Sequence, residues 1–206
     1  TTAQTSNSGV STLFDANFYV LNSARNVYKC LDNNNNSAST VEPTGTDTIV
    51  LSTADGYKWK YMYTMSASEQ SNFLSTDFMA VSTNASVSSN AVDGSIDIVK
   101  IKTAGSGGND GTFTNIPIRG DGTGGVVSVT VTSGAVTSVA VTTAGSGYTF
   151  ATISNAQIVS AGSTNLVGAE LDVIIPPKGG HGFNAVQELG AFFVMTNTSL
   201  EGTESA

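Results

Sequence analysis

Residues 54–70, ADGYKWKYMYTMSASEQ, decide the fold class of this 206-residue chain because two local patterns meet inside them. Large side chains occupy every second position from Tyr57 to Met65, which is the alternation of a β-strand with one buried face. An Asp-Gly turn opens this strand. Ser66 and Glu69 then have the spacing of a capping box, which predicts that a short helix begins there.

Aromatic rings are concentrated on one face of this predicted strand. The chain has one Trp and six Tyr, and four of these rings alternate along it: Tyr57, Trp59, Tyr61 and Tyr63. Two interpretations are open. The rings form a protein–protein interface, where Tyr and Trp are enriched, or they form a core. We expect a central strand of a sandwich, in which the rings supply buried area to a chain rich in Ser, Thr, Gly and Val.

The composition favours strands and turns over long helices. Charged residues make up 12% of the chain, against about 25% in typical globular domains. The 22 Gly residues follow no fixed period and suit tight turns. We therefore predict a mainly β, antiparallel fold of short strands and turns, with one or two short helices and an inserted Gly-rich β-repeat domain.

The charge balance excludes two classes of partner. The net charge is −8 and the sequence pI is about 4.3, so a polyanion is repelled and nucleic acid is not an expected partner. The same repulsion argues against an anionic membrane surface. No stretch approaches the roughly 18 apolar residues of a membrane span.

The order of segments predicts one β-sandwich interrupted by an insertion. We expect residues 1–16 to form a flexible arm, because they are rich in Ser, Thr and Gln. Residues 17–92 and 176–206 are predicted to be the two halves of the sandwich core. Residues 93–175 are predicted to be the inserted domain, with two copies of a β-meander.

Smaller elements follow from turn chemistry and local patterns. Residues 18–32 predict a hairpin, and the Asn-rich residues 33–48 predict a loop. Residues 81–94 are small and polar, as in a linker or a strand-edge segment. Residues 184–190, NAVQELG, predict one helical turn that ends at Gly190. Residues 191–200, AFFVMTNTSL, predict a final strand that is apolar enough to be central.

The insertion contains an internal repeat. GSIDIVKIKTAGSG at 94–107 aligns with GAVTSVAVTTAGSG at 134–147, and Gly105 matches Gly145 at an offset of 40 residues. Each copy predicts a three-stranded meander. The further predicted strands cover residues 112–120 and 125–134 in the first copy, and 149–159 and 169–175 in the second.

Few residues are candidates for nucleophilic or metal chemistry. His181 is the only histidine, and the GGHG sequence around it predicts an exposed loop. Ser106 and Ser146 lie in repeated Gly-Ser-Gly turns, and no Gly-x-Ser-x-Gly nucleophile motif is present. Strand-like residues follow these glycines, so they do not form a phosphate loop at a helix N-terminus. Cys30 is the only cysteine, and its neighbours predict a buried strand position.

Acidic and Gly-rich loops offer weaker candidates. Arg119-Gly120-Asp121 is an integrin-type tripeptide, which a plain hairpin turn explains well; weak calcium binding there or near Asp110 is the alternative. Nothing in the sequence brings together a pair of carboxylates suited to glycoside hydrolysis. The carboxylates considered for such a pair are Asp93, Asp97, Asp110, Glu170 and Asp172. We therefore predict no enzyme activity and no catalytic, cofactor-binding or metal-binding residues.

Four short segments resemble a known family. Residues 27–32 (VYKCLD), 41–43 (VEP), 55–61 (DGYKWKY) and 179–182 (GGHG) are similar, in this order, to the gene-8-type baseplate wedge subunit of T4-like contractile-tailed phages. Residues 134–149 also resemble a β-repeat found in tail and baseplate proteins of marine phages. The repeat region takes the place of the family's middle domain.

The resemblance implies a function in assembly rather than catalysis. It implies a non-enzymatic β-sandwich protein that forms a homodimer and joins other baseplate wedge proteins, with no small-molecule substrate. It places the chain in the virion, at the tail baseplate, after assembly in the host cytoplasm. The alternative is a receptor- or glycan-binding tail protein, or a secreted adhesin, that uses the Gly-rich loops. A hydrolase that depends on His181 is a third and weaker hypothesis.

Overall fold

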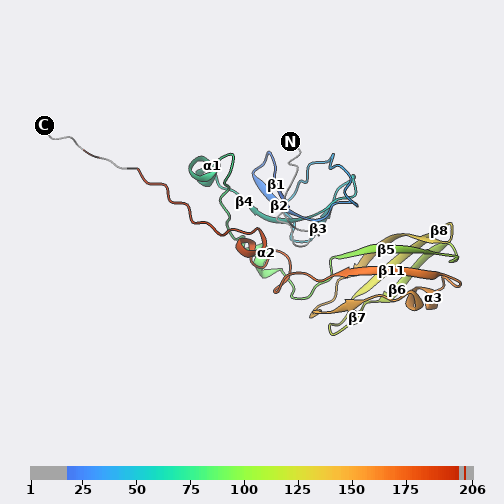
Figure 1. Cartoon of the computed structure of the whole chain (residues 1–206). Coiled ribbons are helices and arrows are strands. Elements are labelled where there is room, and N and C mark those ends of the chain that lie inside the picture. Colours follow the sequence, from blue (N-terminus) through green and yellow to red (C-terminus); the bar gives the residue numbers. More distant parts are fainter. Residues whose placement is uncertain (1–17, 200–201, 203–206) are drawn as a thin grey trace.

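The computed structural model describes residues 18–199 and 202, and it is mainly β (Figure 1). Strands account for 37% and helices for 12%, and the sheets are antiparallel, which confirms the predicted fold class. The strands of the described part are β1 (Tyr19–Leu21), β2 (Asn26–Asp32), β3 (Val50–Ser52), β4 (Lys58–Thr64), β5 (Ile98–Ser106), β6 (Gly111–Pro117), β7 (Arg119–Gly120), β8 (Val126–Thr132), β9 (Ala135–Thr143), β10 (Ala151–Thr152) and β11 (Val167–Ile174). Its helices are α1 (Ala67–Phe73), α2 (Ala85–Ser89), α3 (Asn155–Ser160) and α4 (Ala185–Glu188). The predicted arm at residues 1–16 lies outside the described residues.

The first sheet has the order β1-β2-β4-β3, so β4 is a central strand, as its sequence predicted. The hairpin between β1 and β2 is confirmed. The capping box at the start of α1 is confirmed as well: the Glu69 amide donates to Ser66 Oγ at 3.1 Å, and the Ser66 amide donates to the Glu69 carboxylate at 2.7 Å. Residues 81–94, predicted to be a linker, contain the short helix α2.

A β-bulge in β4 separates the aromatic rings, so the prediction that all four share one face is wrong. Tyr63 lies opposite Val27 and Tyr61 lies opposite Tyr28, which leaves Met62 as the extra residue. A bulge shifts the alternation of side chains by one position. Trp59 and Tyr61 therefore pack in one hydrophobic cluster, whereas Met62 and Tyr63 pack in another.

Each face of this sheet has its own cover. On the face of Trp59, hydroxyls of two tyrosines donate to carbonyls of the loop at residues 33–48: Tyr28 to Gly45 at 2.6 Å and Tyr57 to Ser37 at 2.5 Å. On the opposite face, Ala185 and Leu189 from α4 and the residue after it pack against Met62 and Tyr63. The interior of β4 is consequently buried on both sides.

The repeat copies do not form separate meanders, and that prediction is wrong. The first strand of each copy pairs with the third strand of the other: β5 with β11, and β9 with β8. The two first strands also lie side by side, where the Ile96 amide donates to the Ala144 carbonyl at 3.0 Å. Because strands of the two copies pair with each other, both copies contribute side chains to one shared core. Two separate meanders would not share a core in this way.

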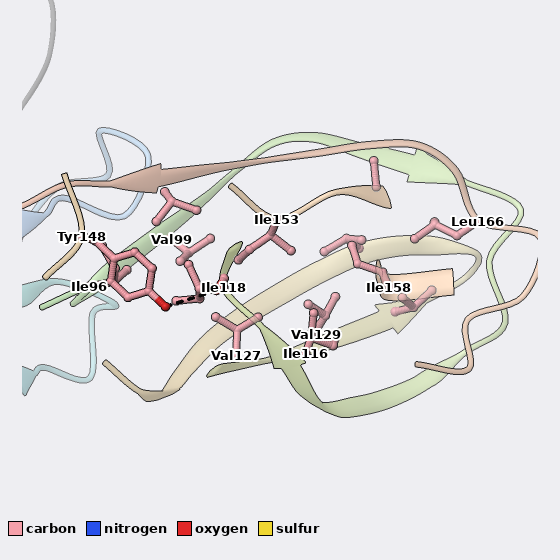
Figure 2. Close-up of a cluster of buried hydrophobic side chains, with 14 residues drawn as sticks. Ile96, Val99, Ile116, Ile118, Val127, Val129, Tyr148, Ile153, Ile158 and Leu166 are labelled. Carbon is pink, nitrogen blue, oxygen red and sulfur yellow. Dashed lines mark hydrogen bonds between the residues drawn. The ribbon is translucent and has the colours of Figure 1, made fainter. Parts of the chain in front are cut away.

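One hydrophobic core fills the repeat region (Figure 2). Tyr148 closes one end of it: its hydroxyl accepts from the Gly125 amide at 3.1 Å and donates to the Ile118 carbonyl at 3.2 Å. The strand predicted over 149–159 is wrong, because only β10 and then helix α3 form there. A Ser154–Gln157 capping box begins this helix, and Ile158 points from it into the core (Figure 2).

The buried side chains form one cluster in the repeat region and two clusters in the rest of the described chain. One cluster uses buried residues between 96 and 173, and the other two use residues 27–87 together with Ala185 and Leu189. Between the two parts, Lys100 Nζ meets Asp32 Oδ1 at 2.6 Å. That residues 93–175 fold as an independent inserted domain stays a prediction.

Candidate functional site

Charged side chains gather where the C-terminal segment covers the first sheet. Lys29 on β2 and Lys60 on β4 are Cα partners across the central strand pair, and both are buried. His181 and Glu188 reach the same place from the loop before α4 and from α4 itself, and they are buried too. Charged residues are rarely buried unless they are paired. We name Lys29, Lys60, His181 and Glu188 the ionic joint.

Glu188 is the centre of the ionic joint. Its carboxylate lies 2.5 Å from His181 Nδ1 and accepts a hydrogen bond from the Gly182 amide at 2.7 Å. Its backbone carbonyl accepts from Lys29 Nζ at 2.9 Å. Lys60 Nζ donates to the carbonyl of Thr48 in the loop before β3. The prediction of an exposed His181 is wrong, because α4 brings a carboxylate from seven residues later back onto the ring.

Gly182 allows this close approach. Its φ of +87° is a left-handed conformation that favours glycine, and a Cβ there would lie 2.5 Å from Val87 Cγ1 and 3.3 Å from Lys60 Cε. Gly182 therefore serves the packing of the loop against β4 and α2.

Burial sets the protonation behaviour of this region. It lowers the pKa of Lys29 and of Lys60, since a buried ammonium loses its hydration. It raises the pKa of the nearby Asp97, although the charges of His181 and Lys60 oppose that rise. Burial opposes ionisation of Glu188, but the hydrogen bond and charge of His181, together with the Gly182 amide and the charge of Lys29, outweigh it, so the pKa of Glu188 lies below its ordinary value.

The geometry of the ionic joint supports a structural role, which is to hold the C-terminal segment against the first sheet. A carboxylate that orients an imidazole also occurs in catalytic triads, where the imidazole in turn contacts a nucleophile. Here Glu188 is the hydrogen-bond partner that the structure gives the His181 ring, and the pair is almost fully buried. Within residues 18–199, no group of three or more His, Cys, Asp or Glu side chains could hold a metal ion. The ionic joint fastens the C-terminal segment to β2 and β4.

The other candidate residues take structural positions. Cys30 is buried, as predicted, and burial raises the pKa of its thiol to about 12. Ser146 pairs its amide and carbonyl with those of Thr123 at 3.0 Å in an isolated β-bridge, so the predicted turn is wrong at this residue. Ser106 ends β5, opposite Val167 of β11.

Acidic candidates bind nearby backbone amides instead of one another. Asp121 accepts from the amides of Thr149 and Phe150 at 3.0 Å and from the Thr149 hydroxyl. Asp110 accepts from the amides of residues 133 and 134 at 3.0 and 2.8 Å. Asp93 accepts from the Gly179 amide at 2.6 Å. Glu170 forms an exposed pair with a lysine of β5. The prediction that the chain has no catalytic or metal-binding residues stays a prediction.

Beyond α4 the chain exposes a run of large apolar side chains. Phe192, Phe193, Val194 and Met195 are 80, 83, 94 and 44% exposed. We name residues 191–199 the C-terminal arm, and Figure 1 shows it leaving the body of the molecule as an extended trace. The prediction of a central final strand is wrong here: in the part of the chain that the structure describes, residues 191–199 pair with no strand.

Two contacts join the C-terminal arm to other parts of its own chain. The Phe193 ring meets the Phe78 ring edge-on, with 6.3 Å between their centroids. Asn197 Nδ2 donates to the Asn72 carbonyl in α1 at 3.2 Å. These contacts leave most of the apolar surface of the arm open.

Sequence reasoning missed the ionic joint. A signal was available, because Lys29 and Lys60 sit among apolar residues in strands that are otherwise buried. The contact between Glu188 and His181 was not predicted. A helix of a single turn is too short to show a periodic pattern, so the sequence does not indicate which face of α4 is buried.

Comparison with known proteins gives no match: no family model fits the chain, and no curated protein or solved structure is significantly similar to it. Among the described residues, no helix is long and apolar enough to cross a bilayer.

Proposed function

We propose that this chain is a non-enzymatic structural subunit of a phage tail baseplate wedge that acts through protein–protein assembly. The observation that carries the proposal is the C-terminal arm, where four consecutive large apolar residues face solvent. Single exposed apolar residues are normal on a protein surface, but a contiguous run marks a site of interaction. Other wedge proteins and a second copy of the chain are the proposed partners, and the virion is its proposed location.

The energy that the arm offers is large enough for assembly. Full burial of a Val, Phe or Met side chain contributes roughly 1.5–3 kcal/mol. Four such residues therefore offer on the order of 6–12 kcal/mol, which is comparable to the entropic cost of association. A short arm of this kind is sufficient where a subunit meets its neighbour at high local concentration, as in a particle, because the entropic cost of association is then lower.

The ionic joint supports the same function because it anchors the base of the arm. Glu188 and Leu189 lie just before the arm, and both are buried against the first sheet. The Ala191 amide donates to the Val186 carbonyl at 2.9 Å and closes α4. The arm therefore starts from a fixed point, which reduces the entropy lost when a partner binds it.

The segments that carry the family resemblance meet in space, which also supports the proposal. Residues 27–32 in β2 pair with residues 58–61 in β4. The Val41 amide donates to the Asp55 carboxylate at 3.0 Å, and Gly182 packs beside Lys60. Short similarities that converge on one packed unit are more informative than the same similarities scattered over a surface.

Immunogold labelling of intact tailed particles tests the proposal. Antibody against this chain is expected to place gold at the baseplate end of the tail. Gold on fibre tips would favour the receptor-binding alternative. Particles without label, with the chain recovered free or on cell surfaces, would contradict a baseplate subunit.

A matched pair of variants tests the role of the arm. Phe193→Asp is expected to abolish incorporation into particles while leaving the melting temperature unchanged, because Phe193 is mostly exposed. Phe150→Asp is the control, since Phe150 is a 63% exposed aromatic residue far from the arm in sequence. Incorporation of both variants at the wild-type level would contradict assembly through the arm.

A further inference from the structure

We infer that the C-terminal arm joins a neighbouring protein as an added β-strand, at an open sheet edge of a subunit that is a different protein. This inference rests on the proposed function and names the kind of partner that the arm recognises. Strand addition supplies backbone hydrogen bonds along an extended peptide and places alternate side chains on the two faces of the recipient sheet.

The composition of the arm fits a strand. Residues 191–199 (AFFVMTNTS) contain aromatic and β-branched residues, no Pro, no Gly and no charged residue. None of them has a positive φ, and Figure 1 shows the segment drawn out. Four apolar residues without a Lys or Arg nearby are too few for a membrane span and lack the basic residues of an interfacial helix.

The distribution of apolar residues indicates what the recipient edge looks like. Phe192 and Val194 would lie on one face of an added strand, and Phe193 and Met195 on the other. A strand that is apolar on both faces fits a sheet that is covered on both sides. We therefore expect the open edge to belong to a sheet of the partner that is covered on both faces.

In the described part of this chain, no strand offers a suitable recipient edge for a second copy. The outer edges of β5 and β9 lie side by side, where the Ile96 amide donates to the Ala144 carbonyl at 3.0 Å. The edge strands β1 and β3 have three residues each. β6 is longer, but Asn115 with φ of +59° interrupts its register. The outer edge of β11 is occupied, because Ile153 bridges Leu171 and the Asn155 side chain accepts from the Ala169 amide at 3.1 Å. Short and bulged edges are how proteins avoid strand addition.

Hydrogen exchange with single-residue resolution tests the inference, using the purified full chain and purified particles that contain it. In the free chain we expect fast exchange across residues 192–199. In the particle we expect slow exchange at every second amide, because an edge strand donates alternate N–H groups to its neighbour. Protection of consecutive amides, or of none, would overturn strand addition.

Two proline variants give a second test in which no large apolar side chain is lost. Thr196→Pro and Asn197→Pro remove adjacent amides, of which only one faces the recipient edge. In competition with wild-type chain during particle assembly, one variant is expected to be depleted on the order of ten- to one-hundred-fold and the other little changed. Equal incorporation, or equal exclusion, of both variants would overturn edge addition.

The failures can be told apart. Absence of the chain from particles would refute the proposed function, whereas its presence with an unprotected arm would refute only the added strand. Photo-crosslinking from position 192 is expected to reach a β-strand of another particle protein. Crosslinks confined to copies of this chain, or protection of the free chain by neutral phosphatidylcholine vesicles, would overturn the choice of partner.

Discussion

Lys29 and Lys60 lie directly opposite each other on the two central strands of the first sheet, on one face, and both are buried. Like charges in this position destabilise a strand pair. The structure places the Glu188 carboxylate and two backbone carbonyls around them as compensation. Glu188 of α4 therefore determines whether the central strands carry uncompensated charge.

Glu188→Gln is expected to lower the free energy of unfolding by about 3 kcal/mol, since removing one partner leaves buried charge uncompensated. Urea denaturation followed by circular dichroism measures the loss. Glu170→Gln is the control, because its pair with Lys102 is exposed on both sides and solvent screens such pairs, so they contribute little to stability. Equal losses in the two variants would refute the central role of Glu188.

Trp59→Ala is expected to destabilise the chain by roughly 3–5 kcal/mol, because the ring is 1% exposed and stacks on Tyr57 at 5.4 Å between centroids. Trp59→Phe is expected to cost much less, since Trp59 Nε1 is buried without a hydrogen-bond partner and Phe removes that N–H. Thermal unfolding by circular dichroism compares the two. A loss below about 1 kcal/mol for Ala would show that Trp59 is not a core residue.

Cys30 is expected to resist alkylation in the native state. Burial removes access and raises the pKa of its thiol to about 12, so little thiolate forms near neutral pH. Iodoacetamide labelling followed by mass spectrometry is expected to proceed no faster than unfolding and to become rapid in urea. Fast labelling of the folded chain would show that the site opens locally.

Asp121 is expected to stabilise the repeat region down to strongly acidic pH. Its hydrogen bonds with the Thr149 hydroxyl and with backbone amides lower its pKa from 3.8 to about 2. For a carboxylate with a lowered pKa in the folded state, the stabilisation is complete above the unfolded pKa and is lost as the pH falls through the folded one. The difference in melting temperature between wild type and Asp121→Asn should therefore shrink as the pH falls from about 5 to about 2, a range that spans the unfolded and folded pKa values of Asp121. A constant difference would contradict the assignment.

Several elements could be predicted because their causes lie within a few residues. The Asp-Gly turn, the alternation in β4 and the Ser66–Glu69 box gave a strand and a helix at the right places. The same kind of signal was present at Ser154 and Gln157, where a strand was predicted and a helix begins. There the flanking β-branched residues favour a strand, whereas the cap favours a helix.

The sequence by itself determined the fold class, the central aromatic strand and the turns, because side-chain alternation and capping act over neighbouring residues. Only the tertiary structure decided that the bulge at Met62 turns Tyr63 to the other face, since a bulge depends on the register with a partner strand. It also decided that Lys29 meets Glu188, 159 positions later, and that a strand-forming C-terminal arm is left without a strand partner among the described residues. Contacts of that range depend on which surfaces remain open after the sheets have formed, and no local pattern contains that information.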